Sequence, residues 1–175
     1  MFFLLLYYLF NNDLIFVIAG KKLITKTSLG ALRCKLARDL DLIKKGDYKF
    51  LWVTDFPSFE WSEEENRFVA CHHPFTAPKD EDIDKLLTDK EHCYSKAYDI
   101  VCNGYEAGGG SIRIHNADVQ EKMFEALELT KEDIEEKFGF FVNAFKYGTP
   151  PHGGLAIGLE RLTMFRFNID DMRLL

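Results

Sequence analysis

The sequence predicts an α+β fold in which helices flank an antiparallel sheet. Strand-like runs follow one another through short turns in the middle of the chain, and most segments with helical periodicity come after them. The two usual phosphate-binding loops, G-x-x-x-x-G-K-[ST] and G-x-G-x-x-G, do not occur in the sequence. A doubly wound parallel sheet is therefore disfavoured.

Length and composition indicate a globular protein. The chain has 175 residues, of which 47% are hydrophobic and 29% charged, enough for one domain, or one domain plus a fragment, with a real core. The net charge of −6 excludes a protein held on nucleic acid by its overall charge, so any such contact must be local. Four cysteines without a C-x-x-C pair exclude a zinc ribbon and indicate a reducing, intracellular compartment.

The first segment, residues 1–10, is apolar throughout. It is much shorter than the roughly 20 residues that cross a bilayer, and it lacks the basic flank and cleavage site of a signal peptide. We interpret it as a buried segment or as the start of a longer element.

An amphipathic helix is expected from Ser28, a suitable N-cap, to just before Gly46. Its apolar positions recur at steps of three and four residues: Leu29, Leu32, Leu36, Leu40 and Ile43. Its outer face is basic, through Lys26, Arg33, Lys35, Arg38, Lys44 and Lys45. Such a face is either simply solvated or a contact for phosphate.

The aromatic and β-branched run 48–56 predicts a strand that ends at Pro57. A hairpin with a polar tip at 62–66 should connect it to a second strand that begins at Arg67 and stops at Pro74. The acidic segment 79–91 is expected to be a surface loop or a short helix. Two further strands, 97–106 and 110–115, are expected to be separated by the glycines at 108–110.

Two helices and a strand–helix unit complete the chain. Asp118 with Glu121, and Thr130 with Asp133, have the spacing of capping boxes, so each pair predicts a helix start. Their apolar positions are Val119, Met123 and Leu127, then Ile134, Phe138 and Phe141. The apolar run 152–158 predicts a strand, and helical periodicity continues from Leu159 to Phe165.

Chemistry is concentrated in residues 99–115, where Asp99, Glu106, Arg113 and His115 surround four glycines. These charges either lie exposed beside a turn or form a site for an anionic substrate and a divalent metal, because carboxylates bind Mg²⁺ and arginine binds carboxylate or phosphate. On one regular strand the two carboxylates would lie on opposite faces and roughly 23 Å apart. A shared metal site therefore requires a bend or a bulge, which Gly104 permits.

Other candidates carry two interpretations each. Glycines 108–110 are either a linker or a point where backbone approaches a ligand closely. Neighbours on a strand point to opposite faces, so His72 and His73 cannot share one ion and one of them faces the pocket. Arg161, in the first turn of a helix, either pairs with Glu160 or has an anionic or aromatic partner such as a nucleotide. His115 and His152 are interpreted as core or surface residues.

Four segments together resemble the C-terminal part of bacterial-type aspartyl-tRNA synthetases, which are class II enzymes: FLWVTDFP (50–57), HHPFTAPKD (72–80), AYDIVCNGYEAGGGSIRIHN (97–116) and EKFGFFVNAFKYGTPPHGGLAIGLERLTM (136–164). The resemblance implies a class II synthetase-like antiparallel sheet, here a partial catalytic core. It further implies that 1–46 is the end of an insertion domain and that 47–175 is the C-terminal part of the catalytic domain.

The resemblance also implies an activity, aspartate–tRNA ligation. Aspartate would attack the α-phosphate of ATP to give aspartyl-adenylate, and the aspartyl group would pass to tRNA, with ATP and Mg²⁺ required. The partners would be L-aspartate and tRNA, the tRNA being bound through parts largely missing here. The intact family forms a homodimer, and a cytoplasmic location without a membrane contact is expected.

Site residues carry over by motif. Aspartate would be held by His72 and Arg113 within a pocket shaped by Gly108, Gly109 and Gly110, and Mg²⁺ by Asp99 and Glu106. ATP would be bound by Glu106, Gly158, Leu159, Glu160 and Arg161. Within this set Arg113, Glu106 and Arg161 would be catalytic.

The chain departs from the family pattern in several places. Glu160 stands where members usually have Asp, and no arginine is followed two positions later by Glu or Asp, as the second class motif requires. The first motif and the anticodon-binding barrel are also missing. We therefore expect a fragment that is weak or inactive alone. Lysyl and asparaginyl synthetases are alternatives within the class, and a non-catalytic remnant that binds nucleotide, amino acid or RNA is the alternative outside it.

Overall fold

The computed structural model describes residues 14–44, 46–167 and 169. Contacts along the chain divide it into two compact units, Met1–Asp47 and Tyr48–Leu175. This division falls within a residue of the boundary predicted from the sequence, although the assignment of the first unit to an insertion domain stays a prediction. Residues 1–10, interpreted above as buried, lie outside the described residues.

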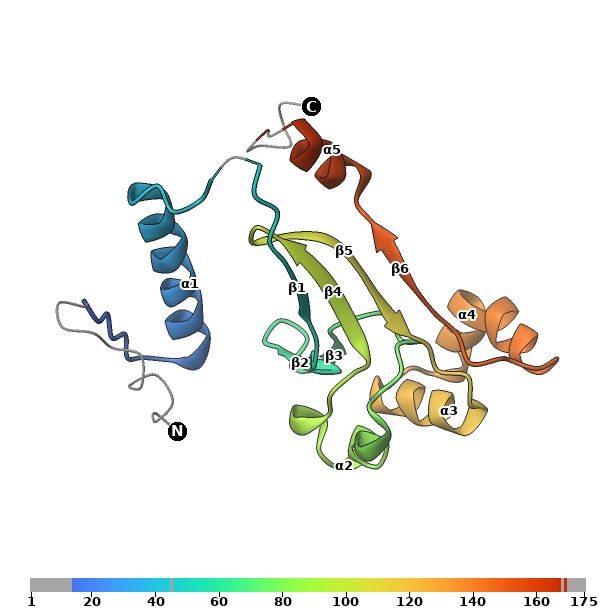
Figure 1. Cartoon of the computed structure of the whole chain (residues 1–175). Helices are drawn as coiled ribbons and strands as arrows, with labels where there is room; N and C mark the ends of the chain where they lie inside the picture. Colours follow the sequence, from blue (N-terminus) through green and yellow to red (C-terminus); the bar gives the residue numbers. More distant parts are fainter. Residues whose placement is uncertain (1–13, 45, 168, 170–175) are drawn as a thin grey trace. The chain divides into compact units, whose positions relative to one another are not determined.

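In the described residues of the first unit the structure contains one helix, α1 (Lys22–Asp39) (Figure 1). The predicted start at Ser28 is wrong, because the helix begins six residues earlier and Ser28 lies inside it. Its N-cap is Lys21, whose side chain makes no capping hydrogen bond. The predicted continuation to Ile43 is also wrong, since the backbone turns left-handed at Asp41, with φ of 50°. A non-glycine residue in that conformation ends a right-handed helix.

The second unit is built on a four-stranded sheet in the order β1-β4-β5-β6, in which every neighbouring pair is antiparallel (Figure 1). Its strands are β1 (Phe50–Val53), β4 (Ala97–Cys102), β5 (Tyr105–Ile112) and β6 (Gly153–Ile157). A separate hairpin consists of β2 (Phe59–Ser62) and β3 (Arg67–Ala70). The predicted α+β architecture with an antiparallel sheet is confirmed.

The first hairpin turns where the sequence predicted, but its first strand is not the predicted one. β3 pairs with β2, so that Phe59 lies opposite Ala70, whereas β1 pairs with β4 in the larger sheet. The two strands β1 and β2 are separated at Asp55, where φ is 61°. One continuous strand over 48–56 was predicted because the run is rich in aromatic and β-branched residues, yet the left-handed backbone at Asp55 redirects the chain.

Three helices lie at one end of the sheet, α2 (Lys85–Thr88), α3 (Ala117–Ala126) and α4 (Lys131–Phe145), and α5 (Leu159–Phe167) lies at the opposite end, after β6 (Figure 1). Short 3₁₀ turns at Asp80–Asp82 and Lys90–His92 flank α2. The capping box of Thr130 with Asp133 is confirmed at α4. The one predicted at Asp118 is wrong, because Asn116 caps α3 and its side chain accepts hydrogen bonds from the amides of Asp118 and Val119.

The core of the second unit lies between the β2–β3 hairpin, the α2 region and α3. Its buried members are Phe59, Ala77, Leu86, Cys93, Ile114, Met123, Ala126 and Leu127. Beside it, four phenylalanine rings surround Phe75 at centroid distances of 4.7–5.8 Å: Phe124, Phe138, Phe141 and Phe145. All four cysteines are free thiols. This packing fixes the loop before Phe75 and the end of β5, which both lead into the site.

Candidate functional site

The β4–β5 hairpin turns at Asn103 and Gly104, which have φ of 49° and 86°. An Asn-Gly pair with both residues at positive φ is the favoured two-residue connection between antiparallel strands. The sequence prediction was wrong on this point, since it extended the first strand to Glu106 and placed the glycines 108–110 between the strands. All three glycines lie inside β5. The reversal at Gly104, which a shared carboxylate site requires, is present.

A β-bulge brings the two carboxylates to one face of the sheet. The register shifts between Ile100 and Val101, so that Asp99 lies opposite Gly109 but Val101 lies opposite Glu106. Ala107 is the extra residue, and without it Glu106 would point to the other face. A methyl group on Gly109 would collide with the Asp99 carboxylate and lie 3.4 Å from Oε1 of Glu106. The absence of a side chain at Gly109 therefore leaves room for both carboxylates.

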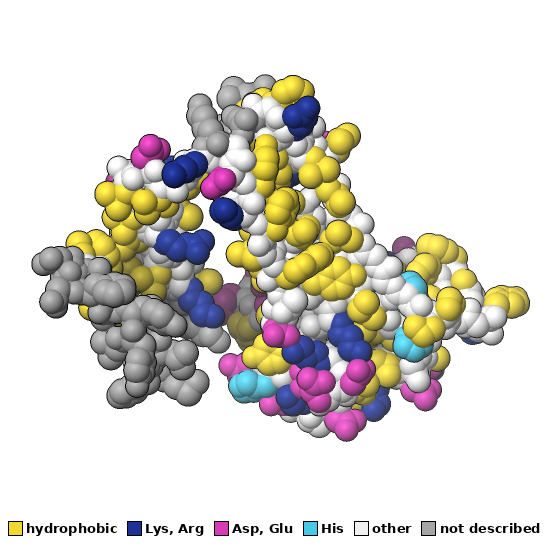
Figure 2. All heavy atoms as spheres, viewed as in Figure 1, with side chains coloured by type: hydrophobic (Ala, Val, Ile, Leu, Met, Phe, Trp, Pro, Cys, Tyr) yellow, Lys and Arg dark blue, Asp and Glu magenta, His cyan; other side chains and the backbone are white. Residues whose placement is uncertain are grey.

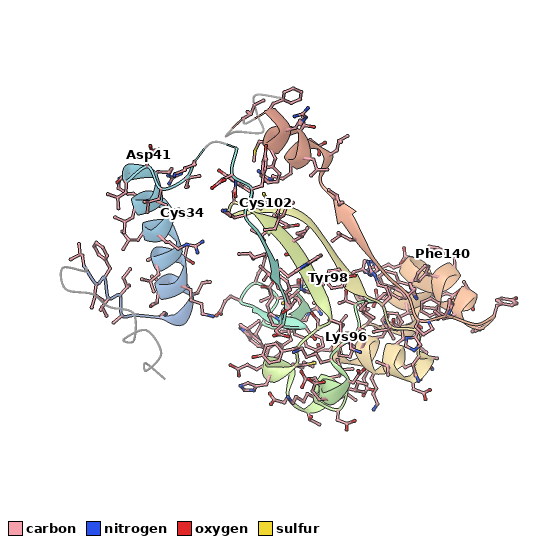
Figure 3. All side chains as sticks on the ribbon, viewed as in Figure 1. Cys34, Asp41, Lys96, Tyr98, Cys102 and Phe140 are labelled. Atoms are coloured by element: carbon pink, nitrogen blue, oxygen red, sulfur yellow. The ribbon has the colours of Figure 1, made fainter. Side chains whose placement is uncertain are left out.

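The other two glycines bring β6 close to β5. A Cβ atom on Gly108 would lie 2.5 Å from the carbonyl oxygen of Ala156, and one on Gly110 would collide with the carbonyl oxygen of Gly154. Gly110 also lies opposite Tyr98, whose hydroxyl donates a hydrogen bond of 3.0 Å to the Gly154 carbonyl on β6 (Figure 3). We conclude that these glycines serve strand packing as well as the cavity.

An open cavity of about 460 Å³ lies over this face of the sheet. The sequence-predicted residues that line it are His72, Asp99, Glu106, Gly108, Gly109, Gly110, Arg113 and Gly158. They come from the loop after β3, from β4, from β5 and the residue following it, and from the end of β6. The structure therefore gathers into one cavity most of the residues that the sequence analysis selected.

The histidines depart from the sequence prediction, because both His72 and His73 line this cavity. Strand alternation does not apply to them, since β3 ends at Ala70 and the chain bends there. His72 packs edge-on against Phe56, and its Nε2 atom is buried without a hydrogen-bond partner. A buried polar atom of this kind costs free energy unless a ligand satisfies it.

His73 lies beside Arg113. Its Nδ1 atom accepts a hydrogen bond of 3.3 Å from the Phe75 amide, and burial lowers its pKa, which the positive charge of Arg113 lowers further. His73 is therefore biased toward the neutral form. Arg113 follows β5, and its amide donates to the His152 carbonyl at 2.9 Å. Within residues 14–44, 46–167 and 169 its guanidinium has no carboxylate partner.

The predicted nucleotide motif is only partly in the cavity. The amide of Gly158 donates to the Ala107 carbonyl at 3.0 Å, which holds the start of α5 against β5. Leu159, Glu160 and Arg161 do not line the cavity. The Arg161 guanidinium lies over the Tyr105 ring at 4.9 Å and donates to Sδ of Met164. Its observed partner is aromatic, one of the partner classes expected from its position in the first turn.

The cavity has an acidic and a basic side. Asp99 and Glu106 supply carboxylate oxygens on one side, and Arg113 supplies a planar donor on the other. The described part of the chain has no group of three His, Cys, Asp or Glu residues that could hold a metal alone. Mg²⁺ is commonly held by one or two carboxylates together with substrate phosphates and water, so the two carboxylates fit that ion when a nucleotide shares the site.

Sequence reasoning missed two buried hydroxyl residues of the cavity. Thr76 and Ser111 lie with their oxygens 3.3 Å apart and both line it. Thr76 forms an isolated antiparallel bridge with Arg113. The available signal was positional: Ser111 directly follows the three glycines, and Thr76 lies within the HHPFT segment.

Comparison with protein families gives a match over residues 13–174 to the family described as "tRNA synthetases class II (D, K and N)". This match spans nearly the whole chain. The chain belongs to the class II tRNA synthetases of this group. The class II assignment agrees with the antiparallel sheet and with the resemblance noted in the sequence.

Two similar curated relatives of this class II chain are both named aspartate–tRNA ligase. An aspartate–tRNA ligase of Staphylococcus carnosus is 58% identical over 163 residues, which is 93% of this chain and 28% of the relative. An aspartate–tRNA ligase of Staphylococcus saprophyticus is 56% identical over 164 residues, with 92% and 28% covered. The chain thus spans little more than a quarter of the length of these relatives.

A solved structure supports the fold of this class II chain. The aspartyl-tRNA synthetase of Entamoeba histolytica aligns with a TM-score of 0.52 at 22% identity, covering 85% of this chain and 29% of that one. At this identity the likeness concerns the fold alone. It agrees with an antiparallel sheet that forms part of a class II catalytic core.

Proposed function

We propose that the chain carries the C-terminal part of an aspartate–tRNA ligase site, which activates L-aspartate with ATP and transfers it to tRNA. The observation that carries this proposal is the cavity in which a bulge and a tight turn bring Asp99 and Glu106 to the face that also holds Arg113. The names of the curated relatives support the choice of aspartate.

Aspartate would bind at the basic side of the cavity. Arg113 offers parallel N–H donors that match the side-chain carboxylate, and a half-buried position strengthens that charge pair. The buried Nε2 atom of His72 is a second contact, since a substrate oxygen or amine would satisfy it. Gly109 and Gly110 keep the floor free of side chains. Asparagine, which is neutral, would leave Arg113 without a charge partner.

ATP would bind at the acidic side. Asp99 and Glu106 would hold Mg²⁺, which neutralises phosphate charge when bound there. Gly158 lies at this wall, and Leu159, Glu160 and Arg161 follow it at the start of α5. The guanidinium of Arg161 lies over the Tyr105 ring at 4.9 Å, and an arginine that contacts an aromatic ring can also stack on a purine ring. We assign Glu106, Arg113 and Arg161 to the catalytic group.

The reaction needs no protein nucleophile. An α-carboxylate oxygen of aspartate attacks the α-phosphorus of ATP, the bond to the bridging oxygen of the β-phosphate breaks, and pyrophosphate leaves. In the second step a ribose hydroxyl of the terminal tRNA adenosine attacks the aspartyl carbonyl, and AMP leaves. The residues of this chain act by positioning the two substrates and by balancing charge at phosphorus.

The decisive experiment is exchange of labelled pyrophosphate into ATP by the purified chain, with aspartate, asparagine or lysine supplied separately. Exchange that depends on aspartate alone supports the proposal. Binding of aspartate and ATP by calorimetry without any exchange supports the alternative, a non-catalytic remnant that binds nucleotide or amino acid. A folded chain that binds neither substrate contradicts the proposed site.

Arg113→Leu tests the role of the cation. Removal of one partner of a buried charge pair costs about 2–5 kcal/mol, so aspartate should bind at least about 30-fold more weakly while ATP binding changes little. Arg166→Leu, an exposed arginine in the last turn of α5, is the matched control. Equal losses of aspartate and ATP affinity would contradict the assignment.

The remaining expectations concern the whole enzyme and stay proposals. They are the use of tRNA as acceptor, the homodimer and the cytoplasmic location. Within the described residues the structure contains no helix long and apolar enough to cross a membrane.

A further inference from the structure

The first unit is basic within an acidic protein. Residues 1–47 contain eight Lys and Arg residues and four Asp and Glu residues, whereas the whole chain has a net charge of −6. The helix α1 contains a single acidic residue, Asp39. Figure 2 shows basic side chains spaced along its length. The first unit therefore has a local positive potential that the overall composition conceals.

Most of the described basic side chains of this unit lack an acidic partner. Lys35 pairs with Asp39 at 2.7 Å, and in the described part of the unit no ion pair is formed by Lys21, Lys26, Arg33, Arg38 or Lys44. The second unit behaves differently, because most of its lysines pair with carboxylates. Those lysines are Lys79, Lys85, Lys90, Lys96, Lys122 and Lys137. Unpaired exposed cations that are spaced along one helix leave charge free for an external anion.

The spacing of the basic residues along α1 fits a polyanion. Lys26 and Arg33 are seven residues apart, almost two full turns, so they lie on the same side of α1 about 10 Å apart along its axis. Arg38 follows five residues later, about 140° around the axis from Arg33, so it lies on a different side of α1, where a strand that wraps around the C-terminal end of the helix can reach it. A nucleic-acid strand carries a phosphate at every nucleotide, so several cations along a rod can each meet one.

A membrane surface fits this helix less well than RNA. A helix that lies on a membrane needs its apolar residues on one side and its charges on the other. The exposed apolar side chains of α1, which include Leu23, Ile24 and Leu29, lie on different sides of the helix. Charge without a segregated apolar face is the pattern of a phosphate contact.

We propose that α1 is an RNA-binding surface on which Lys26, Arg33 and Arg38 contact backbone phosphates. The choice of RNA rests on the proposed function, since its acceptor is an RNA. The contact is independent of the cavity in the second unit and carries no sequence specificity, because phosphate contacts position a nucleic acid without reading its bases.

The test is fluorescence anisotropy of a labelled RNA hairpin with the full chain, titrated over a range of salt concentrations. The variant is the triple substitution Lys26→Gln, Arg33→Gln and Arg38→Gln, which keeps good helix-forming residues. The matched control, Lys131→Gln, Lys146→Gln and Arg166→Gln, removes the same charge from exposed positions of the second unit. Circular dichroism confirms that both variants are folded.

Wild type and control should bind RNA with a steep salt dependence. The α1 variant should bind more weakly, with a slope of log K against log salt that is shallower by about 2 to 3, because each lost phosphate contact removes 0.7 to 0.9. Equal weakening in both variants would overturn the proposal, as would binding to anionic phosphatidylserine vesicles but not to RNA. RNA binding by a chain that shows no aspartate binding would support α1 while contradicting the proposed catalytic site.

Discussion

Replacement of Gly109 by alanine tests whether this glycine makes space for the two carboxylates. The new methyl group would occupy the position of the Asp99 carboxylate and lie 3.4 Å from Oε1 of Glu106. Overpacking of this kind costs about 1–3 kcal/mol. Alanine normally stabilises a strand by about 0.5–1 kcal/mol relative to glycine. The net expectation is a loss of about 0–2.5 kcal/mol in the free energy of unfolding, toward the lower end if the Asp99 carboxylate turns aside.

Gly154→Ala is the matched control on the neighbouring strand, since a Cβ atom there meets nothing within 4 Å. This variant should be stabilised by about 0.5–1 kcal/mol. Urea unfolding followed by circular dichroism measures both changes, and equal m-values would show that the comparison is valid. If the two variants had the same unfolding midpoint, the steric account of Gly109 would be refuted.

Three further outcomes follow from single residues. Thr130→Ala removes half of the capping box at α4 and should lower the free energy of unfolding, measured in urea, by about 1 kcal/mol. An unchanged unfolding midpoint would mean that the cap does not stabilise the protein. Gly104→Ala forces an alanine to φ of 86° and should cost about 1–2 kcal/mol, whereas Asn103→Gly should be nearly neutral. The lowered pKa of His73 means that the unfolded chain binds more protons just below pH 6.5, so this residue's contribution to stability should fall as the pH falls through that range. In Arg113→Leu the pKa of His73, measured by NMR titration, should rise, and no rise would contradict the assigned charge effect.

Much of the fold follows from the sequence where one local rule acts alone. The Thr130–Asp133 capping box and the strand–helix order at the end of the chain were predicted correctly, because each depends on a few adjacent residues. The start of α1 was missed, since its N-cap has no capping side chain and gives no signal. The hairpin partner of β3 was missed because the left-handed backbone at Asp55 cannot be recognised among extended-favouring neighbours.

The sequence predicted which residues form the candidate site better than it predicted how they are arranged. Asp99, Glu106 and Arg113 stood out as charges among glycines, and the need for a reversal at Gly104 followed from strand alternation. A bulge was one of the two expected ways to bring the carboxylates together, but its position at Ala107 did not follow, because it depends on how β4 and β5 pair across the sheet. The placement of His73 in the cavity depends on the bend after β3, which strand periodicity does not contain.

The register of β5 has a consequence for the order in which this protein folds. β4 and β5 are joined through a two-residue turn, so they can pair within microseconds, whereas β6 must close the loop 113–152 before Gly153 meets Ile112. The Asp99–Glu106 wall is thus built from local contacts, and the wall containing Ala156 and Gly158 comes from a distant segment. Loss of β6 alone would open the cavity without disturbing its carboxylates, and we expect the amides of β6 to exchange with solvent deuterium earlier than those of β4.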